Sequence, residues 1–277
     1  MDYIEVDIKV AKRDPFSEIL IAKLNEIDFE SYVEHDYGVT AYIQNQLFDK
    51  YKFKEVIHEV KHMTDIKFNI KDIDSVNWNK QWEENFNPVF INQKCVVRAD
   101  FHSSFENIEH EIIINPKMSF GTGHHATTYL MMNQLFFCDI LNKKVLDVGS
   151  GTGILSILAS KLNSHSVIGI DIDQNAYQNA MENALLNKAS NIDFLHGNIQ
   201  IIIDYKFDLL LANINRNIIL QDIDCYYSVM NKEADLIMSG FYEEDMDLIL
   251  NKTNQLGFSL VDSKNKDKWL MLHLKKV

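Results

Sequence analysis

The sequence predicts an α/β protein: a small α+β domain of the ferredoxin-like type, followed by a doubly wound, mostly parallel sheet of seven strands. From about Lys94 to the C-terminus, strand patterns alternate with helical patterns, which is typical of a parallel sheet covered by helices. Residues 1–73 follow the order β-α-β-β-α-β, which is typical of a ferredoxin-like sandwich. The 277 residues are enough for two hydrophobic cores.

The small domain is expected over residues 1–73, from local patterns of apolar, capping and turn residues. Tyr3–Val10 alternates like a strand, and Asp14 with Pro15 is expected to open a helix, as cap and first helical residue. Asp36-Tyr37-Gly38 indicates a hairpin turn. The remaining expected elements are strands at 30–34, 40–44 and 66–73 and a helix at about 47–63.

Residues 74–92 are aromatic and polar, with Trp78, Trp82, Phe86 and Pro88, and we interpret them as a linker or docking segment. Residues 93–277 are expected to form the second domain. Its last two strands have only a short polar connection, so they should be antiparallel to each other. The strands are expected at 144–149, 166–171, 192–196, 208–213, 234–239, 258–262 and 269–274.

Gly149, Gly151 and Gly153 lie between an expected strand and an expected helix. Glycine permits positive φ and a close approach of the backbone to a ligand. Asp171 ends the next strand, roughly 20 residues on, where an acidic side chain meets a ribose in nucleotide-binding units. The dinucleotide fingerprint would place its third small residue at Ile154. The pattern therefore predicts an adenosine-containing cofactor and disfavours NAD.

Asn213 ends an apolar strand at the expected carboxyl edge of the sheet, where ligands bind in open α/β folds. Its side-chain oxygen could accept a hydrogen bond from an amine, and alternatively it could cap the helix expected near Arg216. Enzymes that methylate the amines of DNA bases have prolines and an aromatic residue after this Asn. Here Ile214-Asn215-Arg216 follows, so nothing is present to stack on a flipped base.

Residues 120–128, Phe-Gly-Thr-Gly-His-His-Ala-Thr-Thr, precede an apolar helix. Glycines and hydroxyls at a helix start can wrap a ligand with backbone N–H groups. His124 and His125 have no carboxylate or cysteine at a metal-ligand spacing, so we expect no metal there. His58-Glu59-Val60-Lys61-His62 matches the zinc-protease motif H-E-x-x-H. Its Glu and second His lie on the solvated face of the helix, so we interpret the match as chance.

With these motifs the chain resembles the bacterial ribosomal protein L-eleven methyltransferases, the PrmA-type family of class I S-adenosylmethionine-dependent methyltransferases. The resemblance covers most of the chain, and residues 120–128 carry its most specific motif. It implies the class I methyltransferase fold and S-adenosylmethionine as cofactor. It also implies that the small domain recognises the ribosomal protein, which is methylated on lysine ε-amines and on its N-terminal α-amine.

The same resemblance implies site residues, matched motif by motif. Asn213 would face the amine as the catalytic residue. The chain departs from the family at His124 and Ala126, where Thr and Pro are usual, and at Asn215, where Leu is frequent. These departures alter the opening of the site and leave the cofactor residues intact. The implied cofactor residues are Phe120, Gly121, Thr127, Thr128, Gly149, Gly151, Asp171 and Asn213.

The composition limits the class of partner. A net charge of −13 disfavours non-specific binding to nucleic acid, and it suits a basic protein substrate or simple solubility equally well. Three scattered cysteines without C-x-x-C indicate neither a disulfide framework nor a zinc site. Met1–Glu5 lacks the features of a signal peptide, and no apolar run reaches the length of a membrane span. We expect a cytoplasmic monomer with no membrane or sequence-specific nucleic-acid partner.

Three alternatives remain open on the sequence alone. The chain could be a methyltransferase of the same fold that acts on another protein or on a small amine. It could be an NAD-dependent oxidoreductase, which the position of Ile154 disfavours. It could also be a non-catalytic ribosome-binding protein that retains the fold.

Overall fold

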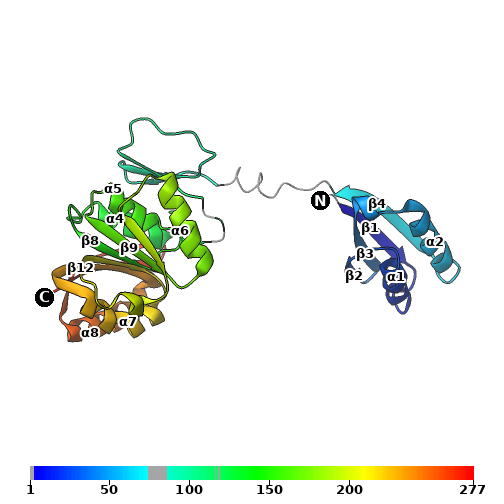
Figure 1. Cartoon of the computed structure of the whole chain (residues 1–277). Coiled ribbons are helices and arrows are strands. Elements are labelled where there is room, and N and C mark those ends of the chain that lie inside the picture. The colour runs from blue at the N-terminus through cyan, green and yellow to red at the C-terminus, as the bar shows by residue number, and fades with distance from the viewer. Residues whose placement is uncertain (1–2, 74–85, 116, 118) are drawn as a thin grey trace. The chain divides into compact units, whose positions relative to one another are not determined.

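The chain divides into two compact units, Met1–Asn85 and Phe86–Val277 (Figure 1). The computed structural model describes residues 3–73, 86–115, 117 and 119–277. Trp78 and Trp82, which the sequence assigns to a linker, lie outside these residues. Among the described helices, none combines the length and the apolar character needed to cross a membrane.

The first unit has the ferredoxin-like topology that the sequence predicts. All neighbouring strands of its sheet are antiparallel, in the order β2-β3-β1-β4. In β1, Ile4, Val6, Ile8 and Val10 are buried and the alternate side chains are not, because successive side chains point to opposite faces. The elements are β1 (Tyr3–Val10), α1 (Phe16–Asn25), β2 (Ser31–His35), β3 (Gly38–Gln44), α2 (Lys50–Lys61) and β4 (Ile66–Ile73).

The two helices of this unit begin differently from each other. Pro15 is at the N-cap of α1 and no side chain caps this helix, so the prediction that Asp14 caps it is wrong. Helix α2 has a side-chain cap that the sequence analysis did not name. The Asp49 carboxylate accepts hydrogen bonds from the backbone N–H groups of Tyr51 at 2.8 Å and Lys52 at 3.2 Å.

The second unit contains the predicted seven-stranded sheet, in the order β10-β9-β8-β11-β12-β14-β13. Only β14 is reversed, since it is antiparallel to both β12 and β13. The strand positions and the antiparallel last pair are as predicted, and the observed strands β12, β13 and β14 are longer. The strands are β8 (Lys144–Val148), β9 (Ser166–Asp171), β10 (Ile192–His196), β11 (Phe207–Asn213), β12 (Met230–Tyr242), β13 (Phe258–Lys266) and β14 (Trp269–Lys276).

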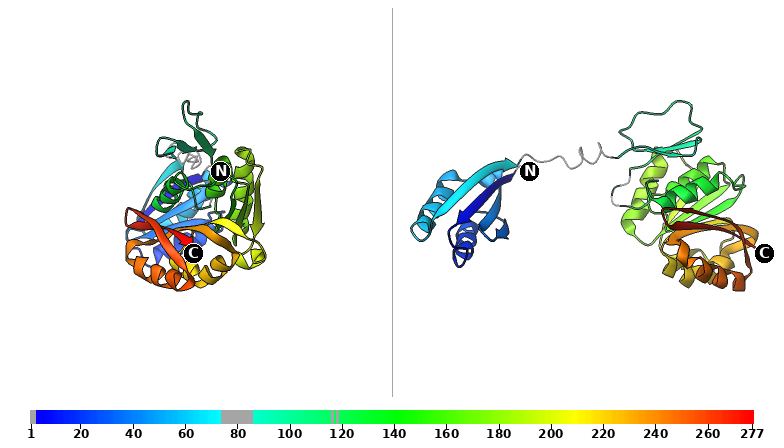
Figure 2. Two further views of the ribbon diagram at one scale, coloured as in Figure 1. Left: turned by 90° about the vertical axis from the view of Figure 1, so that its left-hand side faces the viewer. Right: turned by 180° about the vertical axis from the view of Figure 1, so that it is seen from behind.

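Helices cover both faces of this sheet (Figures 1 and 2). Leu209 and Leu211 of β11 belong to the core under α4, α5 and α6, whereas Leu210 and Ala212 belong to the core under α7 and α8. A strand buried on both faces must be apolar throughout, which is why β11 reads as a continuous hydrophobic run. The helices are α4 (Ala126–Leu135), α5 (Ile154–Lys161), α6 (Gln174–Leu186), α7 (Arg216–Val229) and α8 (Met246–Leu256).

A three-stranded sheet that the sequence analysis did not anticipate precedes α4. It consists of β5 (Val89–Ile91), β6 (Cys95–Arg98) and β7 (His110–Ile113), in that order. Strand β5 lies inside the segment 74–92 that was assigned to a linker. These strands have only three or four residues, too few for a periodic pattern. Ile91, Cys95 and Ile112 join the same core as α4 and α5.

Arg98 and Glu111 form a partly buried ion pair on this small sheet. The Arg98 Nη2 donates to Glu111 Oε2 at 3.0 Å, and Nε lies 2.9 Å from Oε1. The Phe105 backbone N–H and the Ser104 hydroxyl also donate to this carboxylate. The hydrogen bond from Arg98, together with these donors, lowers the pKa of Glu111 from its ordinary 4.5 to about 2.

We expect Glu111→Gln to lower the free energy of unfolding by about 2 kcal/mol at pH 7, because it removes a charge-assisted pair and leaves Arg98 unbalanced. A carboxylate with a depressed pKa stabilises the fold above its unfolded pKa. The difference between wild type and variant should therefore shrink as pH falls from 4.5 towards 2. Urea unfolding across this pH range checks it. Glu106→Gln, at an exposed carboxylate, is the control and should change nothing.

Candidate active site

The turn between β8 and α5 has left-handed backbone at all three of its glycines. The φ angles of Gly149, Gly151 and Gly153 are +70°, +56° and +79°. A Cβ on Gly149 would lie 2.3 Å from the Cγ2 of Ile214, and one on Gly151 would lie 2.3 Å from the Phe120 carbonyl oxygen. Glycine is therefore required by contacts within the protein as well as by the backbone conformation.

The segment that contains Phe120 and Gly121 lies directly against this turn. The Thr152 backbone N–H donates to the Phe120 carbonyl at 2.9 Å, and the Thr152 hydroxyl donates to the Gly121 carbonyl. Thr152 is fully buried, while the Phe120 ring is 54% exposed. Two motifs that are far apart in the sequence thus form one wall of the site.

Asp171 ends β9 beside the same turn. One carboxylate oxygen accepts the Gly151 N–H at 2.8 Å, and the other accepts the Asp173 N–H at 2.9 Å. Each oxygen keeps a second lone pair, so the carboxylate can still accept hydrogen bonds from the hydroxyls of a ribose.

A second carboxylate, Asp147, is buried beneath the turn and was not singled out from the sequence. It accepts hydrogen bonds from the Ser156 backbone N–H at 3.1 Å and from the Ser156 hydroxyl at 2.6 Å. Burial raises the pKa of Asp147 to about 6, and the negative charge of Asp171 acts in the same direction. Asp147 therefore holds the N-terminal part of α5 in place through these two hydrogen bonds from Ser156.

Asn213, the predicted catalytic residue, ends β11 and reaches the first turn of α4. Its Nδ2 lies 3.3 Å from the hydroxyl of Thr128, which is fully buried, as is Thr127 beside it. Its Oδ1 is buried and has no hydrogen-bond partner among the described residues. The alternative role as a helix cap is excluded, because the Asn215 side chain caps α7 through the Ile218 N–H at 3.1 Å.

The tandem histidines have structural partners. His125 is the N-cap of α4, with its Nδ1 2.8 Å from the Thr127 hydroxyl, and the Nε2 of His124 lies 2.9 Å from the Asn87 carbonyl. The His125 ring lies 4.8 Å from the ring of Trp269, which begins β14. The sequence analysis missed Trp269, and no local spacing connects it to the site.

The helical motif His58–His62 also has a structural role. The carboxylate of Glu59 pairs with Lys23 of α1, and the hydrogen bond from Lys23 lowers the pKa of Glu59. His58 and His62 pack edge to face, 4.6 Å apart, on the exposed side of α2. Within the part of the chain that the structure describes, no three His, Cys, Asp or Glu side chains gather in a way that could hold a metal ion.

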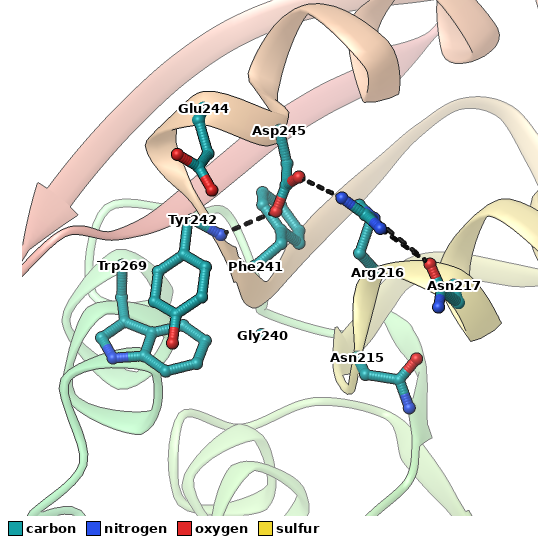
Figure 3. A pocket seen from close by; sticks show the side chains of 9 residues that line it. All are labelled: Asn215, Arg216, Asn217, Gly240, Phe241, Tyr242, Glu244, Asp245 and Trp269. Atoms are coloured by element: carbon teal, nitrogen blue, oxygen red, sulfur yellow. Dashed lines mark hydrogen bonds and ion pairs between the residues drawn. The ribbon is translucent and has the colours of Figure 1, made fainter.

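A pocket of about 510 Å³ opens at the ends of β11 and β12 (Figure 3). On one side, Arg216 Nη1 lies 2.5 Å from Asp245 Oδ1, and the other oxygen of Asp245 accepts the Tyr242 N–H at 3.1 Å. On the other side, the rings of Tyr242 and Trp269 lie 4.3 Å apart. The lining residues are Asn215, Arg216, Asn217, Gly240, Phe241, Tyr242, Glu244, Asp245 and Trp269.

The arrangement fits S-adenosylmethionine. Ser150 Oγ in the glycine turn and Asn213 Oδ1 are both buried and have no hydrogen-bond partner in the described part of the chain. Leaving such atoms unpaired is costly unless a ligand supplies the missing hydrogen bonds. Asp171 ends β9 beside this turn, at the position where a ribose binds in nucleotide-binding folds of this kind. With the strand order of the large sheet, this site defines a class I S-adenosylmethionine-dependent methyltransferase.

Comparison with known proteins shows to which family of methyltransferases the chain belongs. The family model described as Ribosomal protein L11 methyltransferase (PrmA) matches residues 8–277, so the chain belongs to this family. It is 39% identical over 273 residues to the ribosomal protein L11 methyltransferase of Phocaeicola vulgatus, covering 97% of each chain. It is 40% identical over 266 residues to that of Porphyromonas gingivalis, covering 92% of this chain and 89% of the relative.

A solved structure agrees with this assignment. The crystal structure of the ribosomal protein L11 methylase from Lactobacillus delbrueckii subsp. bulgaricus superposes with a TM-score of 0.65 at 26% identity. The match covers 69% of this chain and 99% of that one.

We expect Gly151→Ala to destabilise the protein more than Gly257→Ala, which is its control. Both glycines have positive φ, so both substitutions strain the backbone by about 1 kcal/mol. Only the Cβ at residue 151 would clash with a carbonyl, whereas the nearest atom to a Cβ at Gly257 is 3.5 Å away. We expect a loss of at least about 2 kcal/mol for Gly151→Ala in urea unfolding. Equal losses would contradict a role for the contact with Phe120.

Proposed function

We propose that this protein transfers methyl groups from S-adenosylmethionine to amines of ribosomal protein L11, namely lysine ε-amines and/or the N-terminal α-amine. The observation that carries the proposal is Asn213 Oδ1, a buried acceptor with no hydrogen-bond partner among the described residues, two positions before Asn215 of the open pocket. The names of the curated relatives support the choice of substrate.

The role proposed for Asn213 is to orient the acceptor. When bound, the cofactor supplies a methyl group on a sulfonium, which is already a good leaving group, so the protein has little acid–base chemistry to perform. Asn213 Oδ1 accepts an N–H of the neutral amine and so directs the nitrogen lone pair. The hydrogen bond between Asn213 and Thr128 holds the amide in this orientation. An amine near pKa ~10.4 is mostly protonated at pH 7, and desolvation beside a cation would lower this pKa.

The cofactor site is assigned to the residues of two motifs and two strand ends. Asp171 would bind the ribose hydroxyls, and the backbone of Gly149 and Gly151 would lie along the cofactor. The hydroxyl of Thr128 would act with Asn213 near the methyl group, supported by Thr127. The exposed ring of Phe120, with the buried Gly121 after it, would close the other side of the cofactor.

The small domain, residues 1–73, is assigned to recognition of the ribosomal protein. The acidic charge of the chain, −13, suits a basic substrate because opposite charges favour association. We place the reaction in the cytoplasm and expect a monomer that needs no direct sequence-specific contact with nucleic acid.

The proposal is tested by incubating the purified protein with labelled S-adenosylmethionine and a mixture of ribosomal proteins, and reading intact masses. We expect one protein, L11, to gain multiples of a methyl mass. Methylation of a different protein would show that L11 is not the substrate. Cofactor binding without transfer would favour a non-catalytic ribosome-binding role. Calorimetry with S-adenosylmethionine and with NAD should give binding only of the former.

We expect Asn213→Ala to lower kcat about 100-fold, because the amine loses the acceptor that orients it. Cofactor affinity should change much less in this variant.

Asp171→Ala should mainly affect the cofactor and weaken its binding about tenfold or more, since it removes an acceptor for the ribose. Calorimetry gives the affinities and steady-state kinetics gives kcat. An unchanged kcat in Asn213→Ala would refute the role of this residue.

A further inference from the structure

The pocket of Figure 3 is built directly onto the transfer site. Asn213, the last residue of β11, pairs with Ser239 of β12. Asn215 follows Asn213 by two residues and Gly240 follows Ser239 directly, and both line the pocket. A Cβ on Gly240 would lie 2.1 Å from the Ile214 carbonyl oxygen, so the two chain segments touch there. A group in the pocket would therefore be next to Asn213.

The side chains around the pocket form a chain of contacts that returns to Asn213. Asp245 holds Arg216 and the backbone of Tyr242, and the Tyr242 ring packs on Trp269. Trp269 then contacts His125, which caps the helix that carries Thr128, the partner of Asn213. A continuous series of contacts thus links the aromatic pair to the amide of Asn213.

Among the charged residues that line the pocket, the carboxylate of Glu244 is not paired with a cation of the lining. Arg216 is paired with Asp245, so these two charges cancel. Glu244 also lines the pocket, is exposed, and makes no hydrogen bond or ion pair with the described residues. An unpaired carboxylate beside two aromatic rings is suited to a single cation on an apolar stem, because aromatic faces attract cations and pack against methylene groups.

We propose that this pocket receives the ε-ammonium of a substrate lysine in its protonated form, with Glu244, Tyr242 and Trp269 as its specificity residues. The ammonium then gives up its proton to solvent before the neutral nitrogen is oriented by Asn213 Oδ1. The inference rests on the proposed function and extends it. Lysine arrives charged at pH 7, and its four-carbon stem lets the ammonium enter while the substrate backbone stays outside. An α-ammonium is attached directly to the backbone and would fit the pocket less well.

Glu244→Gln and Glu243→Gln form a matched pair for the test. The neighbouring Glu243 does not line the pocket, and its carboxylate accepts a hydrogen bond from Asn265 at 3.1 Å. We expect Glu244→Gln to raise the KM for L11 about fivefold in lysine methylation, with kcat within about twofold of wild type. The effect should shrink at high salt. Glu243→Gln should behave as wild type. Peptide mass spectrometry separates methyl groups on lysines from those on the N-terminal amine, whose KM should change less.

Tyr242→Leu, with Tyr242→Phe as its control, tests the aromatic part of the pocket. The Phe variant keeps the ring and should keep the KM, while the Leu variant should raise it about threefold to fivefold. Equal KM values for Glu244→Gln and Glu243→Gln would overturn the proposal. So would a change confined to the N-terminal amine.

A binding measurement separates failure of this inference from failure of the proposed function. Butylammonium, a mimic of the lysine side chain, is titrated into the cofactor-loaded protein while the indole N–H resonance of Trp269 is followed. We expect a saturable shift in wild type and Glu243→Gln and a severalfold weaker one in Glu244→Gln. This readout needs no transfer, so it stands even if L11 is not the substrate. An unshifted Trp269 resonance in wild type would overturn the pocket assignment.

Discussion

The peptide groups of Phe120 and Gly121 lie against the glycine turn with no room for a side chain between them, and the rest of the site depends on this approach. Thr152 donates from its backbone and its hydroxyl to these two carbonyls. Because the turn must pass so close, residue 151 has left-handed backbone without a Cβ. Its N–H then points to Asp171, which couples the turn to the next strand. One steric constraint thus places both the cofactor turn and the carboxylate beside it.

The sheet supplies the second level of organisation. Parallel strands end at one edge, so β8, β9, β11 and β12 bring a glycine turn, a carboxylate, an amide and the Tyr242 ring to the same place. Both faces of the sheet are covered by helices, so the edge is where its polar groups meet a ligand. The reversed strand β14 begins at this edge, which is why Trp269 reaches His125 and Tyr242. The glycine turn, Asn213 and the pocket therefore lie close together at one edge of the sheet.

Much of the fold could be predicted because its signals are local. The apolar runs of β8, β9 and β11, the helical stripes between them and the β-α-β-β-α-β order of the first unit appear in short windows. The sheet of β5, β6 and β7 could not be predicted, because strands this short show no periodic pattern of apolar residues. They become stable only by packing on the core that contains α4 and α5. The prediction that Asp14 caps α1 was wrong, because a residue type that often caps helices does not by itself fix the residue at which a helix begins.

For the site, the sequence by itself determined the glycine turn between a strand and a helix, Asp171 at a strand end and Asn213 at the edge of the sheet, because each follows from its neighbours along the chain. Only the tertiary structure decided that Asn215 is the helix cap and that the buried oxygen of Asn213 has no hydrogen-bond partner among the residues that the structure describes. It alone placed the Arg216–Asp245 pair and the contact of Trp269 with His125. These contacts join residues from different elements, and the packing of strands and helices around the edge of the sheet, rather than any spacing in the sequence, brings them within reach.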